Sequence, residues 1–322
     1  MLGQKLAKRL AIAGRLGDQA ISNVLLVDAF ALPAIPDRPA ALFTALQSDI
    51  TQAGATDLLI ADRPDLIFHM AAVVSGEAEA NFEKGYAVNV DGTRNLLESI
   101  RKIGEGYRPR VVFTSSVAVY GGPFPEIIMD DFHLQPRTSY GAQKAICELL
   151  INDYSRRGFI DGVGLRLPTI CVRPGAPNKA ASGLFSNIIR EPLAGIGAIL
   201  PTGKDVSMVF ASPRSAVGFL MKAAILDTQL LGDRRSLMMP SVWATVGDQI
   251  DALRRVAGQS VVDLISVEPN AEAEKMVANW NFAPFASELA RSLGFTCEES
   301  MDEIIRVHIE DELGGKAPGL TK

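Results

Sequence analysis

Short, uninterrupted apolar runs alternate with helix-forming segments through the first half of the chain. The runs are rich in Val, Ile, Leu and Phe with no polar alternation, which is typical of strands buried on both faces of a parallel sheet. Strands that alternate with helices form right-handed βαβ units. We therefore predict an α/β fold with a doubly wound parallel sheet. The predicted strands are 24–27, 65–73, 110–115 and 162–167 (continued by 168–172), and the predicted helices are 53–61, 86–103 and 140–157.

The pattern changes after Pro174, where Gly and Pro become frequent. We predict that residues 1–173 form a dinucleotide-binding domain, to which a later segment around 204–230 returns. Residues 174–322 are expected to form mainly a smaller, mixed substrate-binding lobe. Residues 2–13 place apolar side chains at helical spacing, so we interpret them as a helix of the fold rather than as an Arg-rich transit peptide. Later helices, without strongly buried strands between them, are predicted at 214–226, 245–257, 285–293 and 301–312.

Charge and residue usage exclude several classes of protein. The formal net charge is -5, which argues against a nucleic-acid partner because such partners attract a basic surface. Cys147, Cys171 and Cys297 are scattered, so they are expected to be reduced cytoplasmic thiols rather than disulfides or zinc ligands. The chain has 3 histidines, which makes a His-rich metal centre implausible. We expect no membrane span, because no uninterrupted apolar run reaches ~18 residues.

Tyr140 and Lys144 stand one helical turn apart in a predicted helix, so their side chains project from the same face. A phenol is a poor base at neutral pH, but an adjacent ammonium lowers its pKa. A tyrosine tuned in this way can accept a proton from an alcohol while hydride leaves the same carbon. Tyr-x-x-x-Lys also occurs by chance as an exposed surface pair. Ser116, at the end of the preceding predicted strand, favours the catalytic interpretation because open α/β sheets bind ligands at that edge.

These motifs resemble the extended short-chain dehydrogenases/reductases, which include nucleotide-sugar epimerases and dehydratases. The resemblance implies that Ser116 hydrogen bonds to the reacting oxygen, that Tyr140 is the acid/base, and that Lys144 bridges the tyrosine and the nicotinamide ribose. It also implies an NAD cofactor. The matching stretches, in family order, are Val27-Asp28, Asp49-Ile50, His69-Met70-Ala71-Ala72, Asn89-Val90-Asp91-Gly92-Thr93, 114–121 and 140–144.

Asp28 favours NAD over NADP. A carboxylate at the end of this strand accepts both hydroxyls of the adenosine ribose and would repel a 2′-phosphate. The alternative is an Asp that only caps its own loop. By resemblance, Asn89 shapes the helix behind the active site, and Asp49 and Ile50 frame the adenine. The expected cofactor contacts are Gly3, Asp28, Asp49, Ile50, Ala71, Ala72, Ser75, Asn89, Tyr140, Lys144 and Pro168.

The start of the chain departs from the family pattern. Met1-Leu2-Gly3 matches the end of the family's Gly-x-x-Gly-x-x-Gly turn, which holds a pyrophosphate at a helix N-terminus. We expect the first strand and the two earlier glycines to be missing from this sequence. A reading frame begun too late is favoured over a truncated product. For the chain as given we expect weak NAD binding and poor stability, because each neighbour of that central strand would lose a hydrogen-bond ladder.

A narrower resemblance points to the D-erythronate dehydrogenase branch of the family. It implies oxidation of a small sugar acid at C2, from D-erythronate to 2-oxo-tetronate, with formation of NADH. A small carboxylate needs a planar, bidentate donor, which Arg173, Arg190 or Arg214 could supply if they do not form ion pairs instead. Ser75, Ser116 and Asn178 are further candidate substrate contacts. The stretches that carry this resemblance are 74–79, 154–159, 165–175, 177–182 and 189–193.

Two alternatives to this function remain open at the sequence level. A nucleotide-sugar epimerase or dehydratase would use the same triad, but would need a longer cleft after Pro174. An NAD-binding protein with impaired catalysis would follow from the shortened N-terminus. By family resemblance we also expect a homodimer that pairs helices at 82–103 and 140–157.

Overall fold

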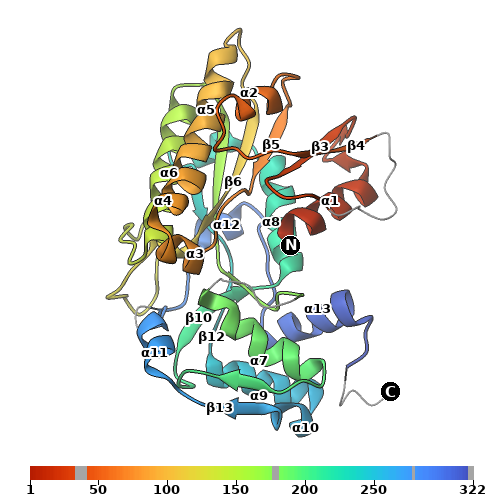
Figure 1. Ribbon diagram of the computed structural model, residues 1–322, viewed down its shortest axis with the longest axis vertical. Helices are drawn as coiled ribbons and strands as arrows, with labels where there is room; N and C mark the ends of the chain where they lie inside the picture. The colour runs from red at the N-terminus through yellow and green to blue at the C-terminus, as the bar shows by residue number, and fades with distance from the viewer. Residues whose placement is uncertain (33–41, 176–180, 278–279, 318–322) are drawn as a thin grey trace. The chain divides into compact units, whose positions relative to one another are not determined.

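The computed structural model describes residues 1–32, 42–175, 181–277 and 280–317, and in them the α/β fold is confirmed (Figure 1). The chain divides into two compact units. Unit 1 comprises Met1–Val119, Thr138–Arg166 and Val217–Leu237, and unit 2 comprises Tyr120–Arg137, Leu167–Ala216 and Met238–Lys322. The boundary expected at residue 173 therefore lies inside unit 2. The assignment of cofactor and substrate to separate domains stays a prediction.

A four-stranded sheet forms the centre of unit 1, with strand order β11-β7-β6-β5. Within it, β5 runs parallel to β6, and His69 lies opposite Phe113. Because the two strands are parallel, the residues that follow β5 and β6 reach the same edge of the sheet. The strands are β5 (Leu66–His69), β6 (Arg110–Ser116), β7 (Asp161–Leu167) and β11 (Ser236–Met238).

A second parallel pair in unit 1 consists of β3 (Val24–Asp28) and β4 (Phe43–Gln47). Among the described residues no ladder joins this pair to the four-stranded sheet, so β3 and β5 are each an end strand. Asp28 lies opposite Gln47 at the carboxyl end of the pair. The parallel strands of unit 1 are thus divided between two sheets rather than gathered in one.

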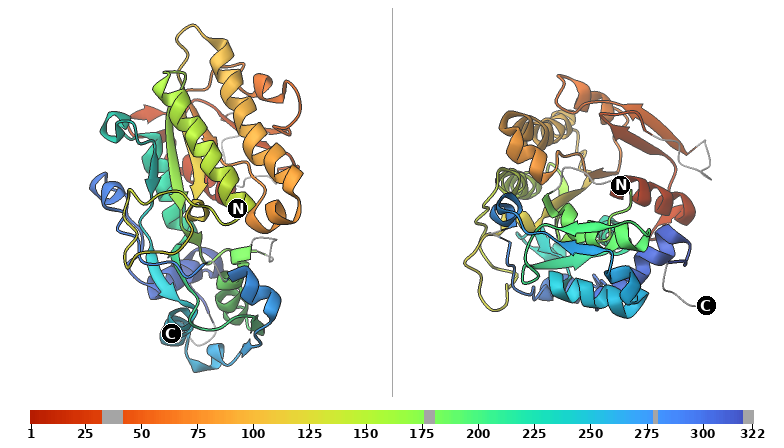
Figure 2. Two further views of the ribbon diagram at one scale, coloured as in Figure 1. Left: turned by 90° about the vertical axis from the view of Figure 1, so that its left-hand side faces the viewer. Right: turned by 60° about the horizontal axis from the view of Figure 1, so that its bottom comes forward.

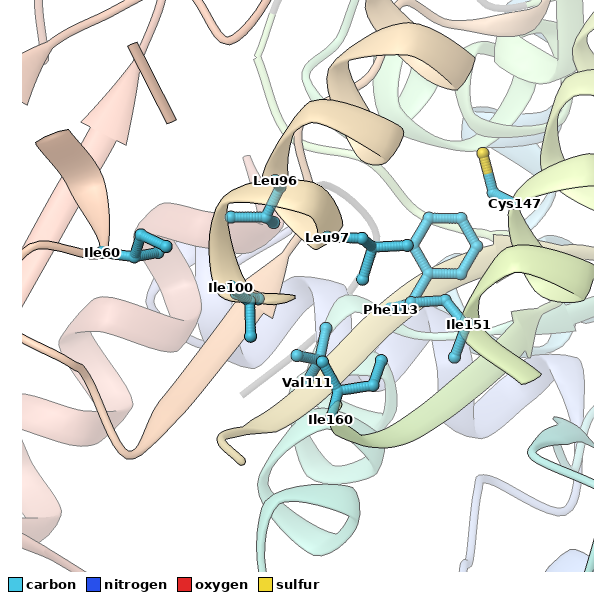
Figure 3. Packing of buried hydrophobic residues seen from close by; sticks show 9 residues of the cluster. All are labelled: Ile60, Leu96, Leu97, Ile100, Val111, Phe113, Cys147, Ile151 and Ile160. Carbon is cyan, nitrogen blue, oxygen red and sulfur yellow. The ribbon is translucent and has the colours of Figure 1, made fainter. Parts of the chain in front are cut away.

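Two long helices of unit 1, α5 (Gly92–Ile103) and α6 (Ser139–Arg156), lie side by side (Figure 1 and Figure 2). Thr138 begins α6 by accepting a hydrogen bond from the backbone N–H of Gly141, which satisfies a donor left over in the first helical turn. Buried side chains from both helices and from β6 form one cluster, and Phe113 is central to it (Figure 3). Its members are Ile60, Leu96, Leu97, Ile100, Val111, Phe113, Cys147, Ile151 and Ile160.

Two sequence predictions in unit 1, a strand and a helix, differ from the structure near the contact between Asn89 and Val73. The strand predicted over 65–73 ends at His69, and the helix predicted over 86–103 begins as a π-helix, Tyr86–Asp91. The Asn89 side chain accepts from Val73 N and donates to Val73 O. The backbone of Val73 is therefore satisfied by a side chain instead of a neighbouring strand, so the ladder need not extend that far.

Unit 2 contains a three-stranded sheet of order β12-β10-β8. Strand β10 (Ser207–Ala211) is buried along its whole length and runs parallel to β8 (Thr169–Ile170) and antiparallel to β12 (Val242–Thr245). The expectation that no strongly buried strand separates the later helices was wrong, because the buried strand β11 follows α8 (Pro213–Ala224) and precedes α9 (Val246–Ala257) in the sequence. The helix predicted over 285–293 was also too long. Phe285 forms a parallel bridge with Ile128, and the helix α12 spans only Glu288–Ser292.

The helices predicted at 2–13, 214–226, 245–257 and 301–312 are present with nearly those bounds. Helix α7 (Leu184–Leu193), which was not predicted, packs against α9 (Val246–Ala257), and α9 packs against α13 (Met301–Leu313). The remaining elements are α1 (Leu2–Ala13), β1 (Arg15–Leu16), β2 (Gln19–Ala20), α2 (Ala55–Leu59), α3 (Ser75–Ala80), α4 (Phe82–Gly85), α7 (Leu184–Leu193), β9 (Ala198–Leu200), α8 (Pro213–Ala224), α9 (Val246–Ala257), α10 (Gln259–Val262), β13 (Ile265–Val267), α11 (Ala271–Val277) and α13 (Met301–Leu313), with 3-10 turns at Val117–Val119, Ala181–Gly183 and Thr228–Leu231.

Candidate active site

Ser116 is the last residue of β6, where the strand gives way to a short 3-10 turn. Its side chain is half-buried, and its Oγ accepts a hydrogen bond from Ala118 N at 3.2 Å. That bond engages the oxygen as an acceptor and leaves the hydroxyl proton available for donation. The predicted position at the carboxyl end of a parallel strand is therefore observed.

Lys144 is buried on the face of α6 that packs on β6. Its ammonium donates a 2.8 Å hydrogen bond to the carbonyl oxygen of Thr114 and lies 4.7 Å from the centre of the Phe113 ring. Burial disfavours the charged form and lowers the pKa of Lys144 to about 8. The Lys144 amine is thus hydrogen-bonded to the backbone of Thr114, two residues before Ser116, and neighbouring charged groups influence its protonation.

Tyr140 lies in the first turn of α6 and is half-buried. The Lys144 nitrogen is 5.7 Å from the centre of the Tyr140 ring. The structure therefore brings these two side chains together, and the exposed surface pair considered from the sequence does not describe Lys144. A cation at this distance favours ionisation of the phenol.

Asn89 is buried and joins three parts of unit 1. Besides its two bonds to the Val73 backbone, its Nδ2 donates to Gln143 Oε1 at 2.7 Å. Gln143 stands on α6 next to Lys144, and a Cβ on Gly85 would lie only 2.5 Å from its Nε2. Asn89 therefore ties the loop after β5 to the helix that carries Tyr140 and Lys144, and Gly85 provides the space for Gln143.

His69 is a buried neighbour of this group. Thr93 Oγ1 donates to Asn89 O at 2.6 Å, so its contact of 2.8 Å with His69 Nε2 makes the histidine the donor there. Burial lowers the pKa of His69 to about 3, with a further contribution from the Lys144 charge. The imidazole is therefore neutral at neutral pH, and its role here is to hold the helix that bears Asn89.

Glu148, Arg166 and Ser115 form a buried hydrogen-bonded cluster behind β6. Ser115 Oγ donates to Glu148 Oε1 at 2.5 Å. Arg166 donates from Nε and Nη2 to the same carboxylate at 3.1 Å and 2.8 Å. The sequence analysis did not single out these residues. A carboxylate one turn after Lys144 on a largely apolar helix face was the available signal.

The carboxylates expected at the cofactor lie after β3 and β4. Asp28 is exposed, and one of its oxygens accepts from Phe30 N at 3.0 Å. Both sequence interpretations of Asp28 remain compatible with this geometry, because the second oxygen is oriented by a capped loop and can still accept a ribose hydroxyl. Asp49 accepts from Thr51 N and Thr51 Oγ1, and these bonds lower its pKa.

Ile50 is held by close packing. A Cβ on Gly92 would lie 2.6 Å from Ile50 Cδ1, so the glycine lets the isoleucine approach the start of α5. Gly3, in contrast, lies within the first turn of α1, with nothing within 4 Å of an added Cβ. The structure thus gives a steric reason for glycine at 92 and none at 3.

The other predicted cofactor residues fall in loops or at element ends. Ala71 and Ala72 lie in the loop that Asn89 clamps at Val73, and Ser75 is the first residue of α3. Pro168 is buried between β7 and β8 in unit 2. An exposed carboxylate for a ribose, a clamped loop and a buried ammonium are a donor set that fits a dinucleotide.

The arginines proposed for a substrate carboxylate have partners within unit 2. Arg173 donates to Ile170 O at 3.0 Å and to Ser182 Oγ at 2.7 Å. Arg190 donates to Arg173 O and forms a 2.6 Å ion pair with Glu191. Arg214 pairs with Asp311 and Glu310, and these partners raise its pKa. Arg190 and Arg214 thus both follow the ion-pair alternative.

Asn178 lies outside the described residues. In the part of the chain that the structure describes, no three His, Cys, Asp or Glu side chains are grouped so as to hold a metal ion. No described helix combines the length and apolar character that crossing a membrane requires.

Comparison with known proteins gives a family and several relatives. A model of the NAD dependent epimerase/dehydratase family matches residues 1–207. A D-erythronate dehydrogenase from Cupriavidus necator is 46% identical over 96% of this chain and 95% of the relative. Another from Haemophilus influenzae is 36% identical over 97% of this chain and 96% of the relative.

Solved structures give the same fold. A crystal structure from Agrobacterium tumefaciens, described as a nucleoside-diphosphate-sugar epimerase, superposes with a TM-score of 0.93 at 54% identity, covering 98% of this chain and 92% of that one. A GalE-like L-threonine dehydrogenase from Cupriavidus necator has a TM-score of 0.81 at 19% identity, covering 97% and 96% of the two chains, and shows the fold alone. With these matches and the Tyr140–Lys144 pair, the chain belongs to the NAD-dependent epimerase/dehydratase family and is an NAD-dependent dehydrogenase of the extended short-chain type.

Proposed function

We propose that this protein oxidises the C2 hydroxyl of D-erythronate to give 2-oxo-tetronate, with reduction of NAD. The observation that carries the proposal is the match to two curated D-erythronate dehydrogenases along nearly the whole chain, at 46% and 36% identity. The stretches that suggested a small sugar acid as substrate come from both units. A substrate of this size needs a compact polar pocket rather than a long nucleotide cleft.

Catalysis is proposed to depend on three side chains of unit 1. Tyr140 takes the proton of the C2 hydroxyl as the carbon–oxygen double bond forms. Ser116, whose oxygen already accepts from Ala118 N, donates its proton to the reacting oxygen. Lys144, at 5.7 Å from the Tyr140 ring, favours the phenolate that acts as base. NAD, when bound, accepts the hydride that leaves C2.

The remaining candidate residues bind or orient in this proposal. Asp28 accepts the ribose hydroxyls of the adenosine, and Lys144 donates to the nicotinamide ribose. Asn89 holds the loop that contains Ala71 and Ala72, through its bonds to Val73. Other cofactor contacts are proposed at Gly3, Asp49, Ile50, Ser75, Tyr140 and Pro168.

The substrate carboxylate is proposed to bind Arg173, or Arg190 in exchange for its ion pair with Glu191, with Ser75 and Asn178 near the hydroxyls. The Arg190 guanidinium donates from Nη1 to the backbone carbonyl oxygen of Arg173 at 2.9 Å. Their existing hydrogen bonds hold both side chains in fixed positions, which reduces the entropy lost when a planar carboxylate binds.

A nucleotide-sugar epimerase is the second candidate. It is favoured by the description of the Agrobacterium tumefaciens structure, which is 54% identical. Both reactions begin by hydride removal from an alcohol carbon, so the triad does not discriminate between them. The difference is in the product, because an epimerase returns the hydride and accumulates no NADH.

The two candidates are separated by NADH absorbance measured with a panel of substrates. D-erythronate, its stereoisomers and UDP-sugars are each incubated with the protein and NAD. We expect NADH to accumulate with a four-carbon sugar acid and not with UDP-sugars. Epimerised UDP-sugar without NADH would support the second candidate and refute the first. The Tyr140→Phe protein is the control for contaminating activity.

The assembly and location are also proposals. We propose a cytoplasmic homodimer, without a nucleic-acid partner, that pairs the helices at 82–103 and 140–157. Two large apolar side chains on these segments support it, because Phe82 is 60% exposed and Leu149 is 66% exposed. Sedimentation of the protein and of Leu149→Glu tests the pairing, since a charge at a buried interface favours monomers.

A further inference from the structure

Glu148 and Lys144 hold consecutive residues of β6. Lys144 Nζ donates to the backbone oxygen of Thr114 at 2.8 Å, and Glu148 Oε1 accepts from Ser115 Oγ at 2.5 Å. The two side chains are one helical turn apart on the buried face of α6. The helix is therefore attached to the strand end at two successive positions, directly before Ser116.

Arg166 attaches a third element to the same carboxylate. It lies on β7, next to β6 in the sheet, and its guanidinium forms a 2.8 Å ion pair with Glu148. The side chains of Arg166 and Glu148 are 10% and 4% exposed, so water contributes little to their stabilisation. A buried carboxylate with three donors around it is fixed in position.

The charge on Lys144 depends on the groups that face it from three elements. On α6 these are Tyr140, Cys147 and Glu148, on β5 His69, and on β7 Arg166 through its pair with Glu148. His69 is neutral, because burial lowers its pKa to about 3, and burial raises the pKa of the Cys147 thiol. Glu148 is therefore the anion that offsets the burial of the Lys144 ammonium.

We propose that Glu148, held by Arg166 and Ser115, is a positioning residue that keeps Lys144 charged and seated on the Thr114 carbonyl. Arg166 limits the strength of this effect, because its charge compensates that of Glu148. The inference rests on the proposed function only through the role given to Lys144. Glu148 itself acts on the lysine and not on the substrate.

The test is the titration of Lys144 in the full-length protein, without substrate. Carbon-13 NMR follows the Cε signals of labelled lysines, and Lys144 is the signal that disappears in Lys144→Met. Glu148→Gln removes the anion and breaks the ion pair between Glu148 and Arg166, so we expect the titration midpoint to fall by about one pH unit or more. An unchanged or higher midpoint overturns the proposal.

Two further variants keep the test decisive. Arg166→Met leaves Glu148 uncompensated, so the midpoint of Lys144 should rise, and this result decides the question if Glu148→Gln does not fold. In the double variant Glu148→Gln/Arg166→Met the midpoint should lie above that of Glu148→Gln, because the Arg166 charge is gone, and below that of the unmodified protein, because Glu148 is gone. A midpoint that does not rise in Arg166→Met, or a double variant at or above the midpoint of the unmodified protein, refutes the electrostatic role of Glu148.

A matched control comes from the same helix. Asp153 forms an ion pair with Arg156 that is 58% and 62% exposed, so Asp153→Asn should leave the Lys144 midpoint unchanged. The titration is independent of the substrate proposal. If D-erythronate is not oxidised, the proposed function fails while the titration still tests Glu148. If it is oxidised and the midpoints do not move, only the role of Glu148 fails.

Discussion

Replacing Asn89 with Leu should remove about 3 kcal/mol from the free energy of unfolding. The Asn89 side chain makes three hydrogen bonds, at 2.9 Å and 3.3 Å to the backbone of Val73 and at 2.7 Å to Gln143. Each such bond contributes about 1 kcal/mol net, and a donor or acceptor left buried without a partner costs about 1–3 kcal/mol. Leu has a similar volume, so it offsets part of this loss by apolar burial.

Urea denaturation followed by circular dichroism measures this loss. Asn95→Ala is the matched control. Asn95 lies on α5, which continues the helical segment that contains Asn89, and it makes one long hydrogen bond of 3.4 Å to Ile50 O. We expect the control to lose less than about 1 kcal/mol. If the free energy of unfolding falls no further in Asn89→Leu than in the control, then Asn89 does not hold the loop after β5 in place. NAD affinity, measured by calorimetry, should fall in Asn89→Leu because that loop contains the proposed cofactor contacts.

Gly92→Ala should destabilise the protein by about 1–3 kcal/mol, because its Cβ would lie 2.6 Å from Ile50 Cδ1. Gly3→Ala is the control: nothing lies within 4 Å of its added Cβ, so its free energy of unfolding should not fall in the same denaturation assay. The pKa of Lys144 is lowered by burial to about 8, so between that pH and its ordinary pKa of 10.5 the unfolded chain binds more protons. The unfolding free energy should therefore rise with pH in this window relative to Lys144→Met, and an equal slope in both proteins would contradict the burial of an ionisable amine. Tyr140→Phe should abolish turnover with D-erythronate in the NADH assay while NAD binding stays nearly intact; residual turnover close to that of the unmodified protein would exclude Tyr140 as the base.

Local sequence signals predicted the elements that carry the candidate site. The helix around 140–157 was predicted and is observed as α6, and the helix spacing placed Tyr140 and Lys144 on one face. The apolar run before Ser116 was correctly identified as a buried strand of the sheet. These features depend on hydrophobic periodicity and on hydrogen bonds between residues close together in the sequence, so a short segment is enough to predict them.

Features that depend on distant partners were not predictable in the same way. The strand after residue 65 stops at His69 because Asn89, twenty residues further on, satisfies Val73. The start of α12 is delayed because Phe285 pairs with Ile128 from a distant loop. A single sequence records the polar or apolar nature of each side chain, but not which remote group it meets.

The sequence by itself determined the α/β class and the order of the catalytic candidates along the chain. Tertiary structure alone decided that Lys144 is buried and donates to the Thr114 carbonyl, and that Glu148 and Arg166 form a buried ion pair behind it. The physical reason is desolvation. The chemical order of residues along a helix is local, whereas the free energy of a buried charge depends on every element that excludes water from it.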